Sequence, residues 1–164
     1  MSFFKQFVHE IVENLGLVFD NEKISVVSSF SPETAVYPLE KPIVTVGYSK
    51  ISAYPGKTRF SGEDESGYYF NKRMDMDVDI SIFVPNKSGG TECYEILWRI
   101  MDYFTFMQSG HRAKIIGASQ IEKYPKLGAL KLSCVVGVET AIDVYEQGDT
   151  EISEINIVRR DLIV

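Results

Sequence analysis

The stretch that decides the fold is residues 74–84, which read Met-Asp-Met-Asp-Val-Asp-Ile-Ser-Ile-Phe-Val. Every even position in it is apolar. Most of the odd positions are polar, namely Asp75, Asp77, Asp79 and Ser81. A period of two sustained this long predicts a β-strand with one face in the core and one acidic face. Because a slip of one residue would bury three carboxylates at once, the pattern also fixes the register of the strand.

A helix is predicted on each side of this strand in the chain. Residues 4–15 carry an apolar stripe at helical spacing, made of Phe4, Phe7, Val8, Ile11, Val12 and Leu15. Ser2 is the expected N-cap and Gly16 the expected end of that helix. Thr91 is the expected cap of the second helix, which ends before Gly110. Its stripe consists of Cys93, Ile96, Leu97, Ile100, Met101 and Phe104.

Shorter apolar runs predict the remaining strands. They lie at residues 24–27, at 43–48 with pairing that continues through 51, and at 113–119. A further strand is expected at residues 129–139, where one face collects Leu130, Leu132, Cys134, Val136 and Val138. The order helix, strands, helix, strands predicts an α+β fold, with an antiparallel or mixed sheet of four to five strands and two amphipathic helices on one face.

Residues 53–73 interrupt this order with a mixture of glycine, charged and aromatic residues. We interpret them as a long mobile hairpin loop, since connections of this length are usually functional or disordered. Aromatic anchors among charges are typical of protein interfaces. The predicted interface residues here are Tyr54, Phe60, Tyr68, Tyr69 and Phe70.

The apolar pattern weakens after Thr140, so we divide the chain into an α+β domain at residues 3–140 and an extended C-terminal arm at residues 141–164. The arm is too sparsely apolar for a third helix and too apolar for a solvated tail. It either adds a strand to a neighbouring molecule or packs on its own subunit. The residues predicted to make its contacts are Ile152, Ile155 and Ile157.

Composition narrows the class of protein. A chain of 164 residues with 45% hydrophobic and 24% charged residues fits one ordinary globular domain. The net charge of -6 and the pI near 5.0 argue against a broad nucleic-acid-binding face. We expect no secretion leader, no transmembrane span and no disulfide, and we interpret Cys93 and Cys134 as core residues.

Motifs for chemistry are missing from the sequence. The spacing of Asp75, Asp77 and Asp79 suggests a calcium loop, but that loop needs glycine and glutamate where this chain has Ile80 and Asn86. On a strand the alternate carboxylates stand roughly 6.6 Å apart, too far for three to close on one ion. The two histidines and the serines stand in no nucleophile, metalloprotease or P-loop motif. We therefore predict no catalytic, metal or cofactor residue, and a structural protein in place of an enzyme.

A family resemblance rests on four quoted segments. Residues 67–73 read Gly-Tyr-Tyr-Phe-Asn-Lys-Arg and lead into the alternating strand, which ends in Phe-Val-Pro at residue 85. Gly89-Gly90 then precede a helix with Cys93 and Glu95, and residues 43–47 stand upstream after Pro38 and Pro42. In this layout, over roughly residues 3–140, the chain resembles the phage tail terminator family.

The resemblance implies a homo-oligomer, a hexameric ring that caps the tail tube and stops its polymerisation. The implied partners are the tail tube protein, with a sheath protein or a head–tail connector as further partners, and no cofactor. The place implied is a virion or a tail-like particle, after synthesis in a bacterial cytoplasm. In such a ring Asp75, Asp77 and Asp79 would face the bore or a basic partner surface.

Two alternatives stay open from the sequence. One is a head–tail completion or neck protein of the same tail assembly, whose subunit would share the acidity and the long loop. The other is a metal-dependent hydrolase or nuclease.

Overall fold

The structure is a computed structural model, and it describes residues 3–20, 23–29, 37–64, 67–106, 112–146 and 157–158. Its two helices are α1 (Phe3–Phe19) and α2 (Gly90–Phe106). Its strands are β1 (Ser25–Ser28), β2 (Ile43–Asp64), β3 (Gly67–Pro85), β4 (Arg112–Ala118), β5 (Glu122–Tyr124), β6 (Ala129–Glu146) and β7 (Ile157–Val158). Two short 3₁₀ turns, η1 (Asn86–Ser88) and η2 (Pro125–Leu127), follow β3 and β5.

The fold is α+β, as predicted. The described strands form one mixed sheet in the order β1-β2-β3-β6-β4, with the short β5 and β7 paired to β6. Only β1 and β2 run parallel, and the other pairs are antiparallel. The sheet thus has seven described strands, more than the four to five expected, because β5 and β7 are too short to leave a pattern in the sequence.

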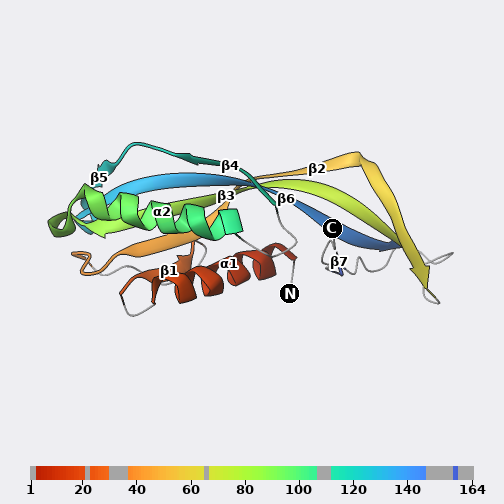
Figure 1. The fold of residues 1–164 in the computed structure, drawn as a ribbon, viewed down its shortest axis with the longest axis horizontal. Helices are drawn as coiled ribbons and strands as arrows, with labels where there is room; N and C mark the ends of the chain where they lie inside the picture. The colour runs from red at the N-terminus through yellow and green to blue at the C-terminus, as the bar shows by residue number, and fades with distance from the viewer. Residues whose placement is uncertain are drawn as a thin grey trace.

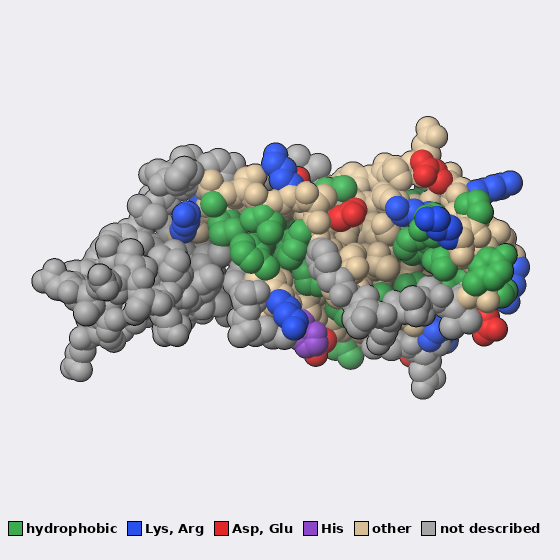
Figure 2. All heavy atoms as spheres, turned by 180° about the vertical axis from the view of Figure 1, so that it is seen from behind, with side chains coloured by type: hydrophobic (Ala, Val, Ile, Leu, Met, Phe, Trp, Pro, Cys, Tyr) green, Lys and Arg blue, Asp and Glu red, His purple; other side chains and the backbone are tan. Residues whose placement is uncertain are grey.

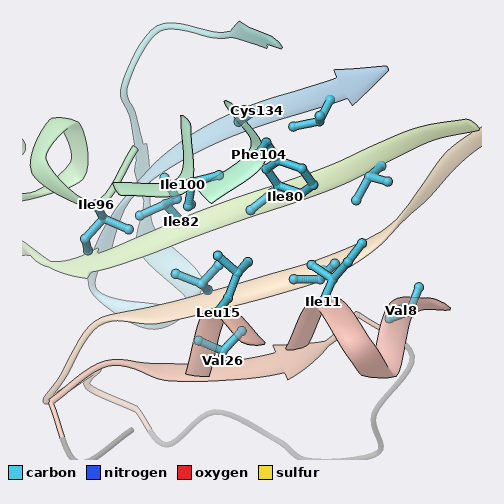
Figure 3. Close-up of a cluster of buried hydrophobic side chains, with 14 of the residues drawn as sticks. Val8, Ile11, Leu15, Val26, Ile80, Ile82, Ile96, Ile100, Phe104 and Cys134 are labelled. Carbon is cyan, nitrogen blue, oxygen red and sulfur yellow. The ribbon is translucent and has the colours of Figure 1, made fainter. Parts of the chain in front are cut away.

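Both helices pack on the same face of the sheet, so the fold has two layers (Figure 1). The side chains between the layers come from every major element, as Figure 3 shows for Ile11 and Leu15 of α1, Ile80 of β3 and Ile100 of α2. These four residues are completely buried. Burial of each such side chain contributes about 1.5–3 kcal/mol, which makes this layer the main source of stability.

Strand β3 has the register that the sequence predicted. Its even-numbered residues from Met74 to Val84 are buried, and Asp75, Asp77 and Asp79 lie on the opposite face and are half-buried. Cys93 and Cys134 are both buried and free, in the core as expected.

Helix α1 is longer than predicted. It does not end at Gly16 but continues to Phe19, which is buried four residues after Leu15 and extends the apolar stripe by one turn. The helix ends at Asp20, whose φ of 56° is in the left-handed region usual for such ends. Packing of Phe19 therefore overrides the weak stop signal of a glycine. The prediction of Thr91 as the cap of the second helix is wrong, because α2 already begins at Gly90 and Thr91 lies inside it. Ser2 and Gly110, the other predicted caps, lie outside the described residues.

The largest correction concerns residues 53–73, which are not a long loop. Strand β2 continues through them to Asp64, and β3 begins at Gly67. The two strands pair from Thr58↔Lys72 to Asp64↔Gly67, and β3 also pairs with β6 along this length. Because the central strand has partners on both sides, its backbone hydrogen bonds are satisfied without a strongly alternating sequence.

The last long strand also runs further than predicted. Strand β6 crosses the expected boundary at Thr140 and continues to Glu146. Ile157 of β7 then pairs with Val144 of β6 in the same chain, so this part of the predicted arm packs on its own subunit. Ile152 and Ile155 lie outside the described residues.

Candidate assembly surfaces

The sheet is longer than the helix layer that covers it. Strands β2, β3 and β6 project beyond both helices as an extension (Figure 1). We define the extension as residues 53–64, 67–73 and 141–146 together with β7. Helix α1 contacts the sheet near the base of the extension. There the Tyr48 hydroxyl of β2 donates a hydrogen bond to the Phe4 carbonyl oxygen at 2.8 Å. Beyond that point no described helix lies on the sheet.

One row of the extension is apolar in every strand. Phe60 of β2 pairs with Phe70 of β3, Phe70 with Val144 of β6, and Val144 with Ile157 of β7. We call these four residues the apolar row. It brings together two of the predicted interface aromatics, Phe60 and Phe70, and one predicted arm residue, Ile157. Phe60 and Ile157 are 97 positions apart in the sequence.

The other predicted aromatics are spread over the extension. Tyr68 pairs with Glu63 and Glu146, two register positions from Phe70. Tyr69 pairs with Gly62 and Tyr145. Tyr54 lies in an irregular part of β2, between the register positions of Ala53 and Thr58. The structure therefore places all five aromatics in the extension but only Phe60 and Phe70 in the apolar row.

The sheet face opposite the helices carries the predicted acidic residues. Asp77 of β3 stands between Lys50 of β2 and Gly137 of β6, and Asp79 stands between Gly47 and Val135. No described helix covers this open face. Glycine neighbours leave room around the carboxylates, and a lysine directly opposite an aspartate is a favourable cross-strand pair.

The end of the acidic strip is balanced by an arginine. Asp75 pairs with Ser52 and with Glu139, which places two carboxylates on adjacent strands. Arg73 Nε lies 2.5 Å from Glu139 Oε1 and forms an ion pair at the same place. The three aspartates are therefore a strip with local counter-charges, more balanced than the sequence pattern alone indicated.

Helix α2 presents two aromatic side chains that the sequence reasoning did not select. Tyr94 is 56% exposed and Trp98 is 64% exposed, although both are large and apolar. They stand one turn apart and off the buried stripe of the helix. Their position off the stripe was the signal that could have found them, because Trp and Tyr are enriched among the residues that dominate interfaces.

Figure 2 shows the molecule from behind, with hydrophobic and charged side chains on the same surface. Hydrophobic side chains gather in one area beside the grey part, and the charged side chains lie singly around it. Among the coloured residues of that view there is no extended field of one sign. A hydrophobic area bordered by separate charges is typical of a protein contact surface.

The described residues offer little for catalysis. They contain no group of three histidine, cysteine, aspartate or glutamate side chains placed to hold a metal ion. Burial, together with the smaller effect of the negative charge of Asp79, raises the pKa of the Cys134 thiol to about 11. Burial also raises the pKa of the Cys93 thiol. Both cysteines are therefore protonated at neutral pH, and a thiol is a poor nucleophile.

The one described histidine, His9, lies on the solvent side of α1. Its Nε2 is 3.2 Å from Glu13 Oε1, one helical turn further along, and both side chains are exposed. His111 lies outside the described residues. In the described part of the chain, neither helix is both long and apolar enough to cross a membrane.

Comparison with known proteins adds no family. No model of a known protein family matches the chain, and no curated protein matches it.

Proposed function

We propose that this chain is a structural subunit that assembles into a ring, and that the ring caps the tail tube of a phage or tail-like particle. The single observation that carries the proposal is the extension, in which three long strands and β7 leave the helix layer and bring an apolar row with them. A sheet that is built out beyond the described helix layer adds surface, which suits contacts with other molecules.

Two further features support an assembly role. On α2, Tyr94 and Trp98 offer an exposed aromatic surface. A subunit that contacts its two neighbours through two different surfaces makes head-to-tail interfaces. Such interfaces generate closed rings when the rotation between neighbours closes. The layout of helix, strands, helix and strands, resembling tail terminators, supports the tail tube as the partner of that ring.

The test begins with the purified chain of 164 residues. Light scattering coupled to size-exclusion chromatography is expected to give a mass near six times 18.6 kDa at high micromolar concentration. Electron microscopy of the same fraction should show rings. A phage tail tube protein should then polymerise into shorter tubes when the ring fraction is present, with the rings at tube ends.

The outcomes separate the competing functions. A protein that stays monomeric at every concentration and leaves tube length unchanged would overturn the proposal. A ring that binds a head–tail connector but not tube ends would favour a completion or neck protein. Cleavage of DNA that requires a divalent metal would favour the hydrolase.

A further inference from the structure

One end of the sheet is lined with lysine side chains. Strands β2, β3 and β6 lie side by side in the sheet, and β2 and β6 begin where β3 ends. Each of these three strands has an exposed lysine two or three residues beyond that end, namely Lys41, Lys87 and Lys126. Lys123 of β5, which pairs with the start of β6, is exposed as well. Blue side chains stand at this end of the molecule, on the right in Figure 2 and opposite the extension.

Backbone hydrogen bonds tie the lysine-bearing segments to one another. The Leu39 amide donates to the Leu127 carbonyl oxygen at 2.9 Å, which joins the segment before β2 to the turn before β6. The Asn86 amide donates to the Gly128 carbonyl oxygen at 3.2 Å, which joins the turn after β3 to the same place. The positions of the lysines are therefore set by the sheet and by these bonds.

An exposed tyrosine lies at the same end. The ring of Tyr37 is next to Gly128, since a Cβ added to Gly128 would stand 3.6 Å from Tyr37 Cε2. Tyr37 is nevertheless 67% exposed. Tyrosine is one of the residues enriched at protein interfaces. We define the lysine end as Tyr37, Lys41, Lys87, Lys123 and Lys126.

The lysine end stays positive when its acidic neighbours are counted. Two described carboxylates are exposed there, Glu40 and Glu122. Glu122 pairs across the strands with Lys131, which is a fifth lysine and is half-buried over the Phe83 ring. Among the described residues, Glu40 is therefore left alone to offset the four exposed lysines.

The neighbouring corner at β1 adds no positive charge. Lys23 stands two residues before β1, but its Nζ forms an ion pair with Asp20 at 3.9 Å. Glu22 precedes Lys23 in the sequence. The positive surface of the described residues at this end is thus confined to the ends of β2, β3, β5 and β6.

The chemistry of the lysine end favours an acidic protein surface over nucleic acid. Its described cations are all lysine, whereas the planar guanidinium of arginine is the group that matches phosphate with two parallel hydrogen bonds. Glu40 and Glu122 would also repel a phosphate backbone, while a protein surface can place carboxylates opposite the lysines alone. With a net charge of -6, a second copy of this chain is itself an acidic protein.

The helix layer is the acidic part of that second copy. The described side chains of α1 and α2 include five carboxylates and two cations, a net charge of -3. They are Glu10, Glu13, Glu92, Glu95 and Asp102 against Lys5 and Arg99. Arg99 is turned toward α1, because it donates a hydrogen bond to the Val18 carbonyl oxygen and lies 4.9 Å from the centre of the Phe19 ring. The outer side of α2 is therefore acidic.

Exposed aromatic side chains stand on that same outer side. Tyr94, Trp98 and Asp102 follow one another at intervals of four residues, so they lie along one line of the helix, with Glu95 beside them. All four are exposed. We call them the α2 surface. The acidic strip on the open face is a weaker match, because its three aspartates are half-buried and no exposed aromatic residue is described among them.

We infer that the lysine end of one copy binds the α2 surface of the next copy, with its lysines opposite Glu95 and Asp102 and with Tyr37 beside Trp98. Both surfaces are exposed in the same molecule, so they do not cover each other within one copy. The inference rests on the ring-forming function proposed above and names one contact between its subunits. Because the two surfaces differ, each subunit gives one and receives one, as a closed ring requires. The extension remains available for a further contact in the assembly.

Charge exchange tests which surfaces meet. Lys87→Glu with Lys126→Glu makes the lysine end negative, and Glu95→Lys with Asp102→Lys makes the α2 surface positive. Each double variant alone brings like charges together, so the dissociation constant of its oligomer should rise roughly tenfold or more at low salt. An equimolar mixture restores opposite charges at every contact and should form rings in which the two variants alternate. The chain with all four substitutions keeps the net charge of -6 and should assemble on its own.

A matched control and a built-in reporter accompany these variants. Lys5→Glu with Lys50→Glu makes the same change in net charge at two exposed lysines outside both surfaces, and it should assemble like the wild type. Trp98 is the only tryptophan of the chain. On assembly its emission should move to shorter wavelength and its quenching by acrylamide should fall. Added salt should weaken the wild-type contact, because it screens exposed charges.

The results distinguish failure of this contact from failure of the ring. If the wild type forms rings and both double variants assemble as well as it does, the ring stands and the proposed contact is wrong. The contact is also wrong if the mixture stays monomeric while the wild type assembles, or if the wild-type complex stops at two copies. If the wild type never assembles, the proposed function fails as well. Circular dichroism and melting curves show that each variant is folded before any of these results is read.

Discussion

The same three strands pass through two environments, and the difference between them explains why one half of the sheet could be predicted and the other could not. In the covered half, β3 alternates between residues sealed under α1 and α2 and residues on the open face. In the extension, β3 continues with the same pairing to β6 but without a described helix above it. Regular pairing therefore persists beyond the described helix layer, and strict alternation of the sequence accompanies burial under the helices.

The first prediction contrasts one truncation in each half and has the largest expected effect. Ile80→Ala removes a fully buried side chain from the covered half and should lower the free energy of unfolding by about 2–5 kcal/mol. Val144→Ala in the extension should cost less than about 1 kcal/mol in the monomer, because no described helix packs there. Urea denaturation of both variants below the assembly concentration measures the contrast. Equal losses would mean that the extension is held by a core of its own.

The second prediction uses a thiol that only the covered half buries. Burial holds the pKa of Cys134 at about 11, above its ordinary value of 9.0. Between these values the unfolded chain loses the proton first, so the folded state binds more protons and stability falls as pH rises. The thiol's contribution is complete below pH 9 and is lost through about pH 11, with an upper limit of about 2–3 kcal/mol.

Cys134→Ala provides the control for this pH dependence. The variant is less stable at neutral pH because it leaves a small cavity, but its stability should fall less steeply between pH 9 and pH 11 than that of the wild type. The two proteins share every other titratable group, so the difference between the two slopes isolates Cys134. Identical slopes would show that the Cys134 thiol does not titrate differently in the folded and unfolded chain.

The covered half was predictable because its sequence obeys the periods of its elements. The strand at residues 74–84 and the buried stripe of α2 were identified from spacing alone, and the structure places their apolar residues in the core. Where the predicted end of a helix was wrong, packing of an apolar side chain outweighed the local stop signal. Gly16 was expected to end α1, but the turn after it carries Phe19 into the core and the helix continues.

The extension was not predictable for a physical reason. Glycine, Pro55 and a cluster of charges are loop signals, and here they occupy bulges and a hairpin tip of paired strands. The third strand, β6, pairs with β3 along this length. The paired residues are distant in the sequence, since Phe70 and Val144 are 74 positions apart. A pairing this distant leaves no local pattern. The exposed pair on α2 did leave one, because Tyr94 and Trp98 stand off the buried stripe of the helix.

The third prediction removes the tip of the extension and tests its independence from the covered half. Residues 59–71 would be replaced by Asn-Gly between Thr58 and Lys72, which are paired and thus close enough for a two-residue turn. The shortened chain should unfold in one cooperative transition, with a midpoint close to that of the wild type and a smaller dependence on urea. Assembly should be lost because Phe60 and Phe70 are gone. A non-cooperative transition would show that the extension is needed to fold the covered half.

The last prediction concerns the open face and has the smallest expected effect on stability. Replacing Asp75, Asp77 and Asp79 together by Asn removes three negative charges from a strand whose other face is sealed in the core. The loss of a favourable pair between Asp77 and Lys50 is offset by relief of repulsion between Asp75 and Glu139, which are paired across β3 and β6. The net change in unfolding free energy should therefore stay within about 0.5 kcal/mol and shrink further with added salt.

If the strip faces the bore or a basic partner in the ring, the triple variant should instead alter assembly or tube capping at low salt and match the wild type at high salt, because exposed charges act mainly through screened, long-range attraction. Capping assays at both salt concentrations decide the matter. Wild-type behaviour of the triple variant at low salt would leave the strip a solvated face with no role in assembly.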